Sequence, residues 1–290
     1  MAEVFSPVAA ELGEGPVWDG DHDRLVWVDI DGRLVHVTSG DGAETRSYPT
    51  PMQPGAAVLR ERGGLLLATG AGFATLSLDG GTVTPLVDAP GSDPAVVRMN
   101  DGEVDPAGRF WAGTKAHDDR PGAGRLYRLE LDGTVTTMLE PVTNSNGMAW
   151  SPDGTALHYI DTPTRSVVRF SYADADGTLG APQPLVDTRT LSGWPDGMCA
   201  DADGNLWIAF WGGWCVRCFS GADGALLEEL AMPVEQPSSV TFGGPGLRRL
   251  FVTSAREGLS AAALAEQPDA GRVHVLEPGV AGLPARRARC

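Results

Sequence analysis

Four side chains with oxygen donors stand directly before a glycine at the start of short apolar runs: Glu14, Asp101, Asn146 and Asp196. If the fold brings several acids of this set together, their burial is unfavourable through desolvation and mutual repulsion. Such a group requires either protons or a bound cation. We take the cation as the simpler interpretation, so the elements that position these side chains decide whether a metal site exists.

The donor types restrict which metal would bind. All are carboxylate or carboxamide oxygens, and no Cys or His occupies an equivalent position. One divalent ion is therefore expected, with Ca²⁺ favoured by ligand type and Mg²⁺, Mn²⁺, Zn²⁺ and Fe²⁺ as alternatives. The competing interpretation is that each Asp or Asn before Gly only forms a turn.

A repeat organises the whole chain. Three segments, DPAGRFWAG from Asp105, SPDGTALHYID from Ser151 and DADGNLWIA from Asp201, share a D-x-x-G-type turn followed by alternating apolar residues. Weaker copies begin near Asp19, Arg60 and Gly243. A period of about 40 to 50 residues is that of four-stranded propeller blades. The sequence thus predicts an all-β fold, one six-bladed β-propeller domain over residues 1–290 with antiparallel blades around a central channel.

Equivalent positions of successive blades reach the same height in such a channel, so the repeat selects the side chains that meet. The residues directly before the six unit starts are Glu14, Pro54, Asp101, Asn146, Asp196 and Ser238. A two-sheet sandwich is the alternative all-β fold, but it predicts strands of irregular similarity rather than six copies of one motif. The N-terminal EVFSPV is expected to pair with the last blade, and LSAAALAEQ to form one short helix.

Composition excludes several functions. The 290 residues carry 22 Lys and Arg against 38 Asp and Glu, a formal net charge of −16 that repels phosphate backbones and anionic membranes. We expect no nucleic-acid or membrane partner, a cytoplasmic location, and a monomer or small homo-oligomer. The four cysteines are too few and too uneven for a disulfide framework. Cys215 and Cys218 lie in one apolar strand with i and i+3 on opposite faces, which favours a structural role over metal binding.

Five longer motifs carry a family resemblance. They are ELGEGPVW from Glu11, RMNDGEVDPAGRFWAGT from Arg98, SNGMAWSPDG from Ser145, PDGMCADADGNLW from Pro195 and FGGPGLRRLFVTSA from Phe242. Together they resemble the gluconolactonase and regucalcin family, also called the senescence-marker protein family, over nearly the whole chain. The last motif is closer to bacterial sugar lactonases than to the animal members.

The resemblance implies a site as well as a fold. It implies one divalent metal bound by Glu14, Asn146 and Asp196, and substrate contacts from Arg98 and Asn100. Counting from the shared AGT, a further acidic contact falls on Asp118, next to His117. The stretch KAHDDRPGAG departs from the family pattern, because Lys115 stands where Met is common, and this leaves the role of residues 115–124 open.

The leading functional hypothesis is hydrolysis of an aldonolactone such as a glucono-, xylono- or arabinono-lactone, with Asp196 as general base. Trp194, Trp211 and Trp214 are candidates for stacking on the sugar. One rival is a phosphotriesterase- or arylesterase-like calcium propeller, which would not need the hydrogen bonds of Arg98 and Asn100. The other is a non-catalytic metal-binding or scaffold propeller, and its test is whether Asp196→Asn abolishes turnover while leaving folding intact.

Overall fold

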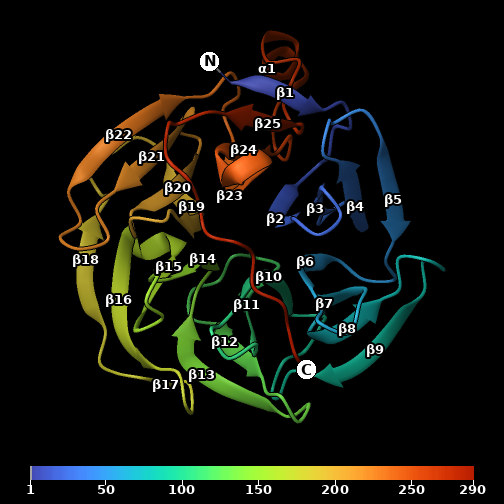
Figure 1. The fold of residues 1–290 in the computed structure, drawn as a ribbon, viewed down its shortest axis with the longest axis vertical. Helices are drawn as coiled ribbons and strands as arrows, with labels where there is room; N and C mark the ends of the chain where they lie inside the picture. The colour runs from blue at the N-terminus through green and yellow to red at the C-terminus, as the bar shows by residue number, and fades with distance from the viewer. Residues whose placement is uncertain (1) are drawn as a thin grey trace.

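The computed structural model describes residues 2–290, which form six antiparallel sheets arranged around a common centre (Figure 1). This confirms the predicted six-bladed β-propeller. From the centre outward, blade 1 contains β2 (Gly13–Asp19), β3 (Arg24–Asp29), β4 (Leu34–Ser39) and β5 (Thr45–Pro49). Blade 2 contains β6 (Pro54–Leu59), β7 (Leu65–Thr69), β8 (Gly72–Leu76) and β9 (Val83–Asp88). Blade 3 contains β10 (Val97–Val104), β11 (Phe110–Ala116), β12 (Gly124–Leu129) and β13 (Val135–Val142).

The second half of the chain repeats this arrangement with one elaboration. Blade 4 contains β14 (Ser145–Trp150), β15 (Ala156–Asp161) and β16 (Ser166–Ala173), and both β17 (Thr178–Leu179) and β18 (Gln183–Asp187) pair with β16. Blade 5 contains β19 (Trp194–Ala200), β20 (Leu206–Trp211), β21 (Cys215–Phe219) and β22 (Leu226–Ala231). Blade 6 contains β23 (Pro237–Gly243), β24 (Arg249–Ser254) and β25 (Val273–Leu276). Two 3₁₀ turns cover Thr162–Thr164 and Pro245–Leu247.

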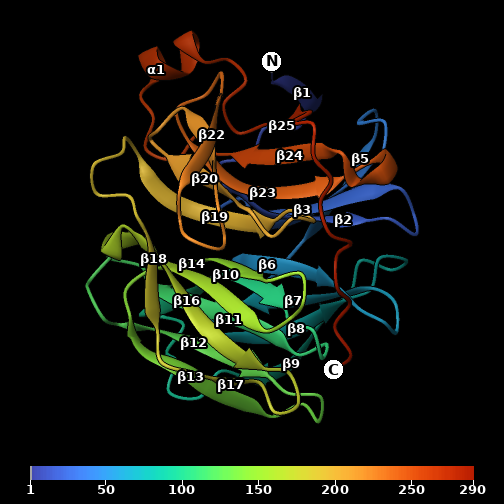
Figure 2. The same ribbon diagram turned by 60° about the vertical axis from the view of Figure 1, so that its left-hand side comes forward.

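The N-terminal strand closes the ring. β1 (Glu3–Ser6) pairs antiparallel with β25 as the outermost strand of blade 6, with Val4 opposite His274. The predicted pairing of EVFSPV with the last blade is therefore confirmed. The expected short helix is also present as α1 (Ala261–Glu266), which begins at Ser260, whose side chain accepts a hydrogen bond from the Ala263 N–H. Figure 2 shows α1 at the periphery, beside blade 6. Within residues 2–290, no helix is long and apolar enough to span a membrane.

The hydrophobic core consists of six clusters, each shared by two neighbouring blades. Val26 and Val28 of blade 1, for example, pack with Leu65 and Leu67 of blade 2. Because both faces of a blade are covered, inner strands are buried along their whole length, while outer strands such as β9 and β22 are largely exposed. Cys215 and Cys218 contribute to different clusters, so the prediction that they face opposite sides of β21 is confirmed.

The repeated turn motif has a packing role. In blade 3, Trp111 Nε1–H donates to Asp105 Oδ2 (2.9 Å), and in blade 5, Trp207 Nε1–H donates to Asp201 Oδ2 (3.0 Å). Each turn Asp therefore fixes the indole six residues later between two blades. Asp105 also accepts from the buried Arg109 Nε (2.6 Å), whereas the described partners of Asp201 are neutral donors.

This difference predicts unequal costs for two matched substitutions. Asp105→Ala leaves the buried Arg109 cation without its carboxylate and is expected to lower the free energy of unfolding by about 3–5 kcal/mol. Asp201→Ala removes only hydrogen bonds with neutral groups and should cost about 1–3 kcal/mol. Urea unfolding of both variants measures the difference. Equal losses would contradict the assignment of the larger effect to the buried ion pair.

A buried histidine in blade 1 predicts a pH effect on stability. His36 Nδ1 contacts Ser47 Oγ (2.8 Å), and its Nε2 has no hydrogen-bond partner among residues 2–290. Burial lowers the pKa of His36 to about 4, against 6.5 for the exposed side chain. The unfolded chain therefore takes up this proton first, and stability is lost as the pH falls from about 6.5 to about 4.

The His36→Gln variant isolates this contribution. We expect the stability of the wild type relative to the variant to decrease on acidification by at most about 1.4 kcal/mol per pH unit within that range. Comparison of the two proteins cancels the opposite effect of buried carboxyl groups, which both contain. Denaturant unfolding at several pH values checks the prediction, and parallel stability curves for the two proteins would contradict it.

Candidate functional site

An irregularity in the innermost strands builds the site. The pairing of every innermost strand with its neighbour shifts register near its start, at the level that the repeat selects. In β10, β14 and β19, the residues left without a partner at this shift include Asn100, Asn146 and Asp196. A bulge re-aims the side chain of its extra residue. These three side chains consequently line a pocket in the channel rather than the space between blades.

The glycines that follow these residues have a role that the sequence did not reveal. Gly147 and Gly197 lie within β14 and β19 rather than in turns. A Cβ on Gly147 would lie 2.6 Å from the Asp196 carbonyl oxygen, and one on Gly197 would lie 2.1 Å from Ser239 Oγ. The innermost strands of neighbouring blades approach too closely for a side chain here. The alternative interpretation as turn formers is thus wrong for these two positions.

The pocket has a volume of about 350 Å³, and most of the residues that line it are polar or charged. Those named by the sequence are Glu14, Arg98, Asn100, Asn146, Asp196, Trp194 and Trp211. The ones it did not name as pocket residues are Leu12, Lys115, Asp119, Asn144, Thr162, Gln236, Glu257 and Gly258. A pocket of this size suits a small ligand of a few hundred daltons or less.

A chain of hydrogen bonds connects three blades within the pocket. Arg98 Nη1–H donates to Asn100 Oδ1 (2.7 Å), and Asn100 Nδ2–H donates to Asn146 Oδ1 (3.2 Å). Asn146 Nδ2–H donates to Thr162 Oγ1 (2.8 Å), whose hydroxyl donates to the Pro195 carbonyl oxygen (2.9 Å). The Asn146 amide is thereby oriented with its nitrogen toward Thr162 and its oxygen toward Asn100.

Glu14 and Asp196 give the pocket its electrostatic character. Both carboxylates are buried. Burial raises the pKa of Glu14, and the Asp196 and Asp101 carboxylates raise it further. Burial likewise raises the pKa of Asp196, with Asp101 adding to the effect. Glu14 Oε2 accepts from the Gly15 N–H (3.0 Å), but no hydrogen bond reaches the Asp196 carboxylate from the described chain.

These observations fit a divalent cation. Two buried carboxylates and one oriented carboxamide oxygen supply the hard oxygen donors that Ca²⁺ and Mg²⁺ prefer. Within residues 2–290 there is no group of three or more His, Cys, Asp or Glu side chains placed to bind a metal, so a site here also needs neutral oxygen donors such as Asn146 Oδ1. Raised pKa values also indicate that both acids would gain from a neighbouring positive charge.

Three residues singled out by the sequence lie outside the pocket lining: Asp101, His117 and Asp118. Asp101 is buried at the same level, where its Oδ1 accepts from the Gly102 N–H (2.7 Å), but it does not line the pocket. The physical reason is that the unpaired residue of the β10 bulge is Asn100. The Asp118 carboxylate is exposed and forms an ion pair with Arg120 (3.1 Å), while the adjacent Asp119 lines the pocket. His117 is exposed, and its Nε2 contacts the Pro94 carbonyl oxygen (3.1 Å).

The repeat contains a signal for part of the missed set. Leu12, Asn144 and Gln236 each stand two residues before a register position, as does Trp194, which the sequence had named, and strand side chains two apart share a face. One further step along each inner strand would therefore have selected them. Lys115, Asp119 and Glu257 lie on β11 or on connections between strands, where the repeat offers no such guide.

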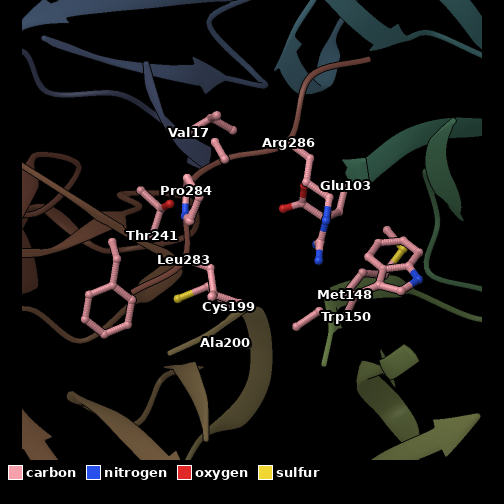
Figure 3. Close-up of a pocket in the computed structure, with 13 residues that line it drawn as sticks. Val17, Glu103, Met148, Trp150, Cys199, Ala200, Thr241, Leu283, Pro284 and Arg286 are labelled. Atoms are coloured by element: carbon pink, nitrogen blue, oxygen red, sulfur yellow. The ribbon is translucent and has the colours of Figure 1, made fainter. Parts of the chain in front are cut away.

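A second, smaller cavity is lined by other residues of the innermost strands and by the C-terminal segment, which crosses the middle of the ring in Figure 1. Figure 3 shows its lining, in which Glu103 and Arg286 lie among mostly apolar side chains such as Met148 and Pro284. Its volume is about 60 Å³. That is space for about two water molecules, so this cavity is too small for an organic substrate.

Fold and pocket together define a six-bladed propeller with an oxygen-rich polar pocket in its channel. The sequence profile of the SMP-30/gluconolactonase/LRE-like region matches residues 12–256. The chain therefore belongs to this family, which confirms the resemblance inferred from the five motifs.

Individual relatives agree with this assignment. A pentonolactonase from Haloferax volcanii is 38% identical over 85% of this chain and 82% of its own length. A 6-deoxy-6-sulfogluconolactonase from Pseudomonas putida is 38% identical, over 93% of this chain and 92% of its own. Among solved structures, the calcium-binding protein regucalcin from Agrobacterium tumefaciens is similar with a TM-score of 0.95, at 28% identity, covering 100% of this chain and 98% of that one.

Proposed function

We propose that the protein is a metal-dependent sugar lactonase that hydrolyses an aldonolactone to the open-chain aldonic acid. The observation that carries the proposal is the convergence of Glu14, Asn146 and Asp196 from three blades in one pocket with Arg98 and Asn100. The names of two relatives, pentonolactonase and 6-deoxy-6-sulfogluconolactonase, support the same class of enzyme. Four free cysteines fit the reducing environment of the cytoplasm, which we propose as its location.

A hydroxyl-rich substrate suits the unpaired groups of the pocket. Asn144 Oδ1 and Gln236 Oε1 are buried, line the pocket and lack hydrogen-bond partners within residues 2–290. Buried acceptors of this kind are costly unless a donor arrives. Sugar hydroxyls supply such donors, whereas a phosphotriester or aryl ester does not. Trp194 and Trp211 also line the pocket and offer apolar surface to a sugar ring, whereas Trp214 does not line it.

The residues that would hold the cation are Glu14, Asn146 and Asp196. Ca²⁺ is proposed on ligand type, with Mg²⁺, Mn²⁺, Zn²⁺ and Fe²⁺ as alternatives for the same donors. When bound, the ion would supply Lewis-acid polarisation of the lactone carbonyl. A bound cation would also offset the unfavourable burial of the two carboxylates, which is the main cause of their raised pKa values.

The side chains of this chain provide the remaining chemistry. Asp196 is the proposed general base: its carboxylate takes a proton from the water whose oxygen attacks the carbonyl carbon, a contribution of about 10²- to 10⁴-fold. The ring C–O bond then breaks, and the ring oxygen leaves as a hydroxyl group after receiving a proton. Arg98 is proposed to donate to substrate oxygens. Asn100 orients Arg98 and Asn146 through its two hydrogen bonds, in addition to its proposed substrate contact.

A substrate panel distinguishes the lactonase from its rivals. Initial rates would be measured with glucono-, xylono-, arabinono- and galactono-lactones, phenyl acetate and a dialkyl aryl phosphate, each corrected for spontaneous hydrolysis. Faster opening of at least one sugar lactone than of both other esters supports the proposal. Preference for the aryl ester or the phosphate would favour the calcium phosphotriesterase-like rival, and no turnover by folded, metal-binding protein would favour the non-catalytic one.

A further inference from the structure

The pocket contains the only lysine of the chain. Of the 22 Lys and Arg residues, Lys115 is the single Lys. It lies on β11 directly opposite Arg98 on β10, and both side chains line the pocket. Residues directly opposite on antiparallel strands share a face with Cβ atoms about 5 Å apart. Two cations therefore stand side by side on one wall of the pocket, an arrangement that is unfavourable unless anions are near.

Arg98 has no carboxylate of its own. The residue is only 7% exposed, and its Nη1–H donates to two neutral oxygens, the Met99 carbonyl (3.0 Å) and Asn100 Oδ1 (2.7 Å). No ion pair joins Arg98 to an acid within residues 2–290, although four acids act on it from greater distances: Asp31, Glu257, Glu14 and Asp119. A buried guanidinium facing a pocket without a paired acid is a ready partner for an anionic ligand.

The ion pair of Lys115 with Asp119 can be replaced by an ion pair with a ligand. Its Nζ lies 2.6 Å from Asp119 Oδ1, but the Lys115 side chain is 19% exposed and the Asp119 side chain 74%. An ion pair whose acid is in solvent contributes only about 0–1 kcal/mol. A ligand that brings its own anion into the pocket can therefore displace Asp119 at little cost, and the ammonium group stays where it is.

We propose that Arg98 and Lys115 form an anion subsite, and that the preferred substrate is a sugar lactone bearing a second acidic group, a carboxylate, sulfonate or phosphate, away from the lactone carbonyl. This inference rests on the proposed lactonase function and specifies its substrate class. Lys115 is the specificity-determining residue, because Arg98 also serves a neutral lactone. Asp119 holds the ammonium in place when the subsite is empty.

Matched substrates and variants test the subsite. The kcat/KM values of D-gluconolactone, D-glucarolactone and 6-phosphogluconolactone would be compared at low ionic strength for the wild type, Lys115→Met, Asp119→Asn and Arg120→Met. We expect the wild type to prefer an acidic lactone by about 10-fold or more, a range that a charge-assisted hydrogen bond supplies. Lys115→Met should reduce this ratio to near one, and Asp119→Asn should increase it several-fold.

Arg120→Met is the matched control, because it removes a cation from the same loop outside the pocket and should leave the ratio unchanged. A wild type that prefers the neutral lactone would overturn the proposal, as would an unchanged ratio in Lys115→Met or an equal loss in Arg120→Met. The acidic lactone with the higher kcat/KM shows whether the subsite prefers a carboxylate or a phosphate. Melting temperatures within a few degrees of the wild type show that each variant is folded.

A binding measurement separates this inference from the proposed function. If no lactone is opened by the wild type, the lactonase proposal fails, and calorimetric titration with galactarate and galactitol then decides on the subsite alone. Tighter binding of galactarate than of galactitol, lost in Lys115→Met, supports the subsite. Equal binding of galactarate and galactitol by the wild type contradicts it. Because Lys115 is the only lysine, it carries the only side-chain amine that an amine-directed reagent can acylate, and galactarate is expected to protect it from labelling.

Discussion

Asp196→Asn is expected to lower kcat for lactone opening by about 10²- to 10⁴-fold, the range that a positioned general base contributes. The amide nearly preserves the shape of the carboxylate but cannot accept the proton of the attacking water. Excess divalent metal should not restore kcat, because the lost group takes part in the chemical step. Initial rates at saturating substrate and metal measure the effect.

The same substitution carries a second expectation, on stability. Burial and the Asp101 carboxylate raise the pKa of Asp196, so its ionised form destabilises the metal-free fold at neutral pH. We therefore expect metal-free Asp196→Asn to melt at a higher temperature than metal-free wild type. Asp187→Asn, which changes an exposed acid on β18, is the matched control and should alter neither property. Loss of activity together with a lower melting temperature would indicate misfolding instead.

Glu14→Gln is expected to weaken the affinity for the divalent ion by about 10²-fold or more, because one of two charged ligands becomes neutral. In contrast to Asp196→Asn, this variant should regain most of its kcat at high metal concentration, since Glu14 is given no role in proton transfer. Calorimetric titration of metal into stripped protein and rates over a range of metal concentrations measure the two effects. A kcat that stays low at saturating metal would assign Glu14 to the chemical step.

Much of the fold could be predicted because each blade repeats the same physical solution. Asp105 and Asp201 each hold a tryptophan of the next strand, so the D-x-x-G motif marks the turn between the first and second strands of a blade. The apolar runs that follow are buried between two blades, which made their strands recognisable. The expected pairing of EVFSPV with the last blade is confirmed, and β1 supplies the outer strand of that blade.

The site was predictable by two routes, because the repeat sets the height of a side chain and the family resemblance implied Arg98 and Asn100. Asn146 and Asp196 stand at the register position and line the pocket, as does Glu14. Asp101 stands there too, but the β10 bulge turns Asn100 into the pocket instead, and a one-residue bulge leaves no sign in an isolated sequence. Lys115 lies near the end of β11 and Asp119 on the connection that follows it, where the repeat sets no equivalent position.

The most direct test of the account is the rate of aldonolactone opening by chelator-stripped protein, measured before and after addition of Ca²⁺, Mg²⁺, Mn²⁺, Zn²⁺ or Fe²⁺. The account predicts a rate close to that of buffer for the stripped protein and recovery with at least one of the ions. Recovery should be accompanied by a rise in melting temperature, because an ion that binds only the folded state stabilises it. Full activity of the stripped protein, or no lactone opening with any ion in folded protein that binds metal, would contradict it.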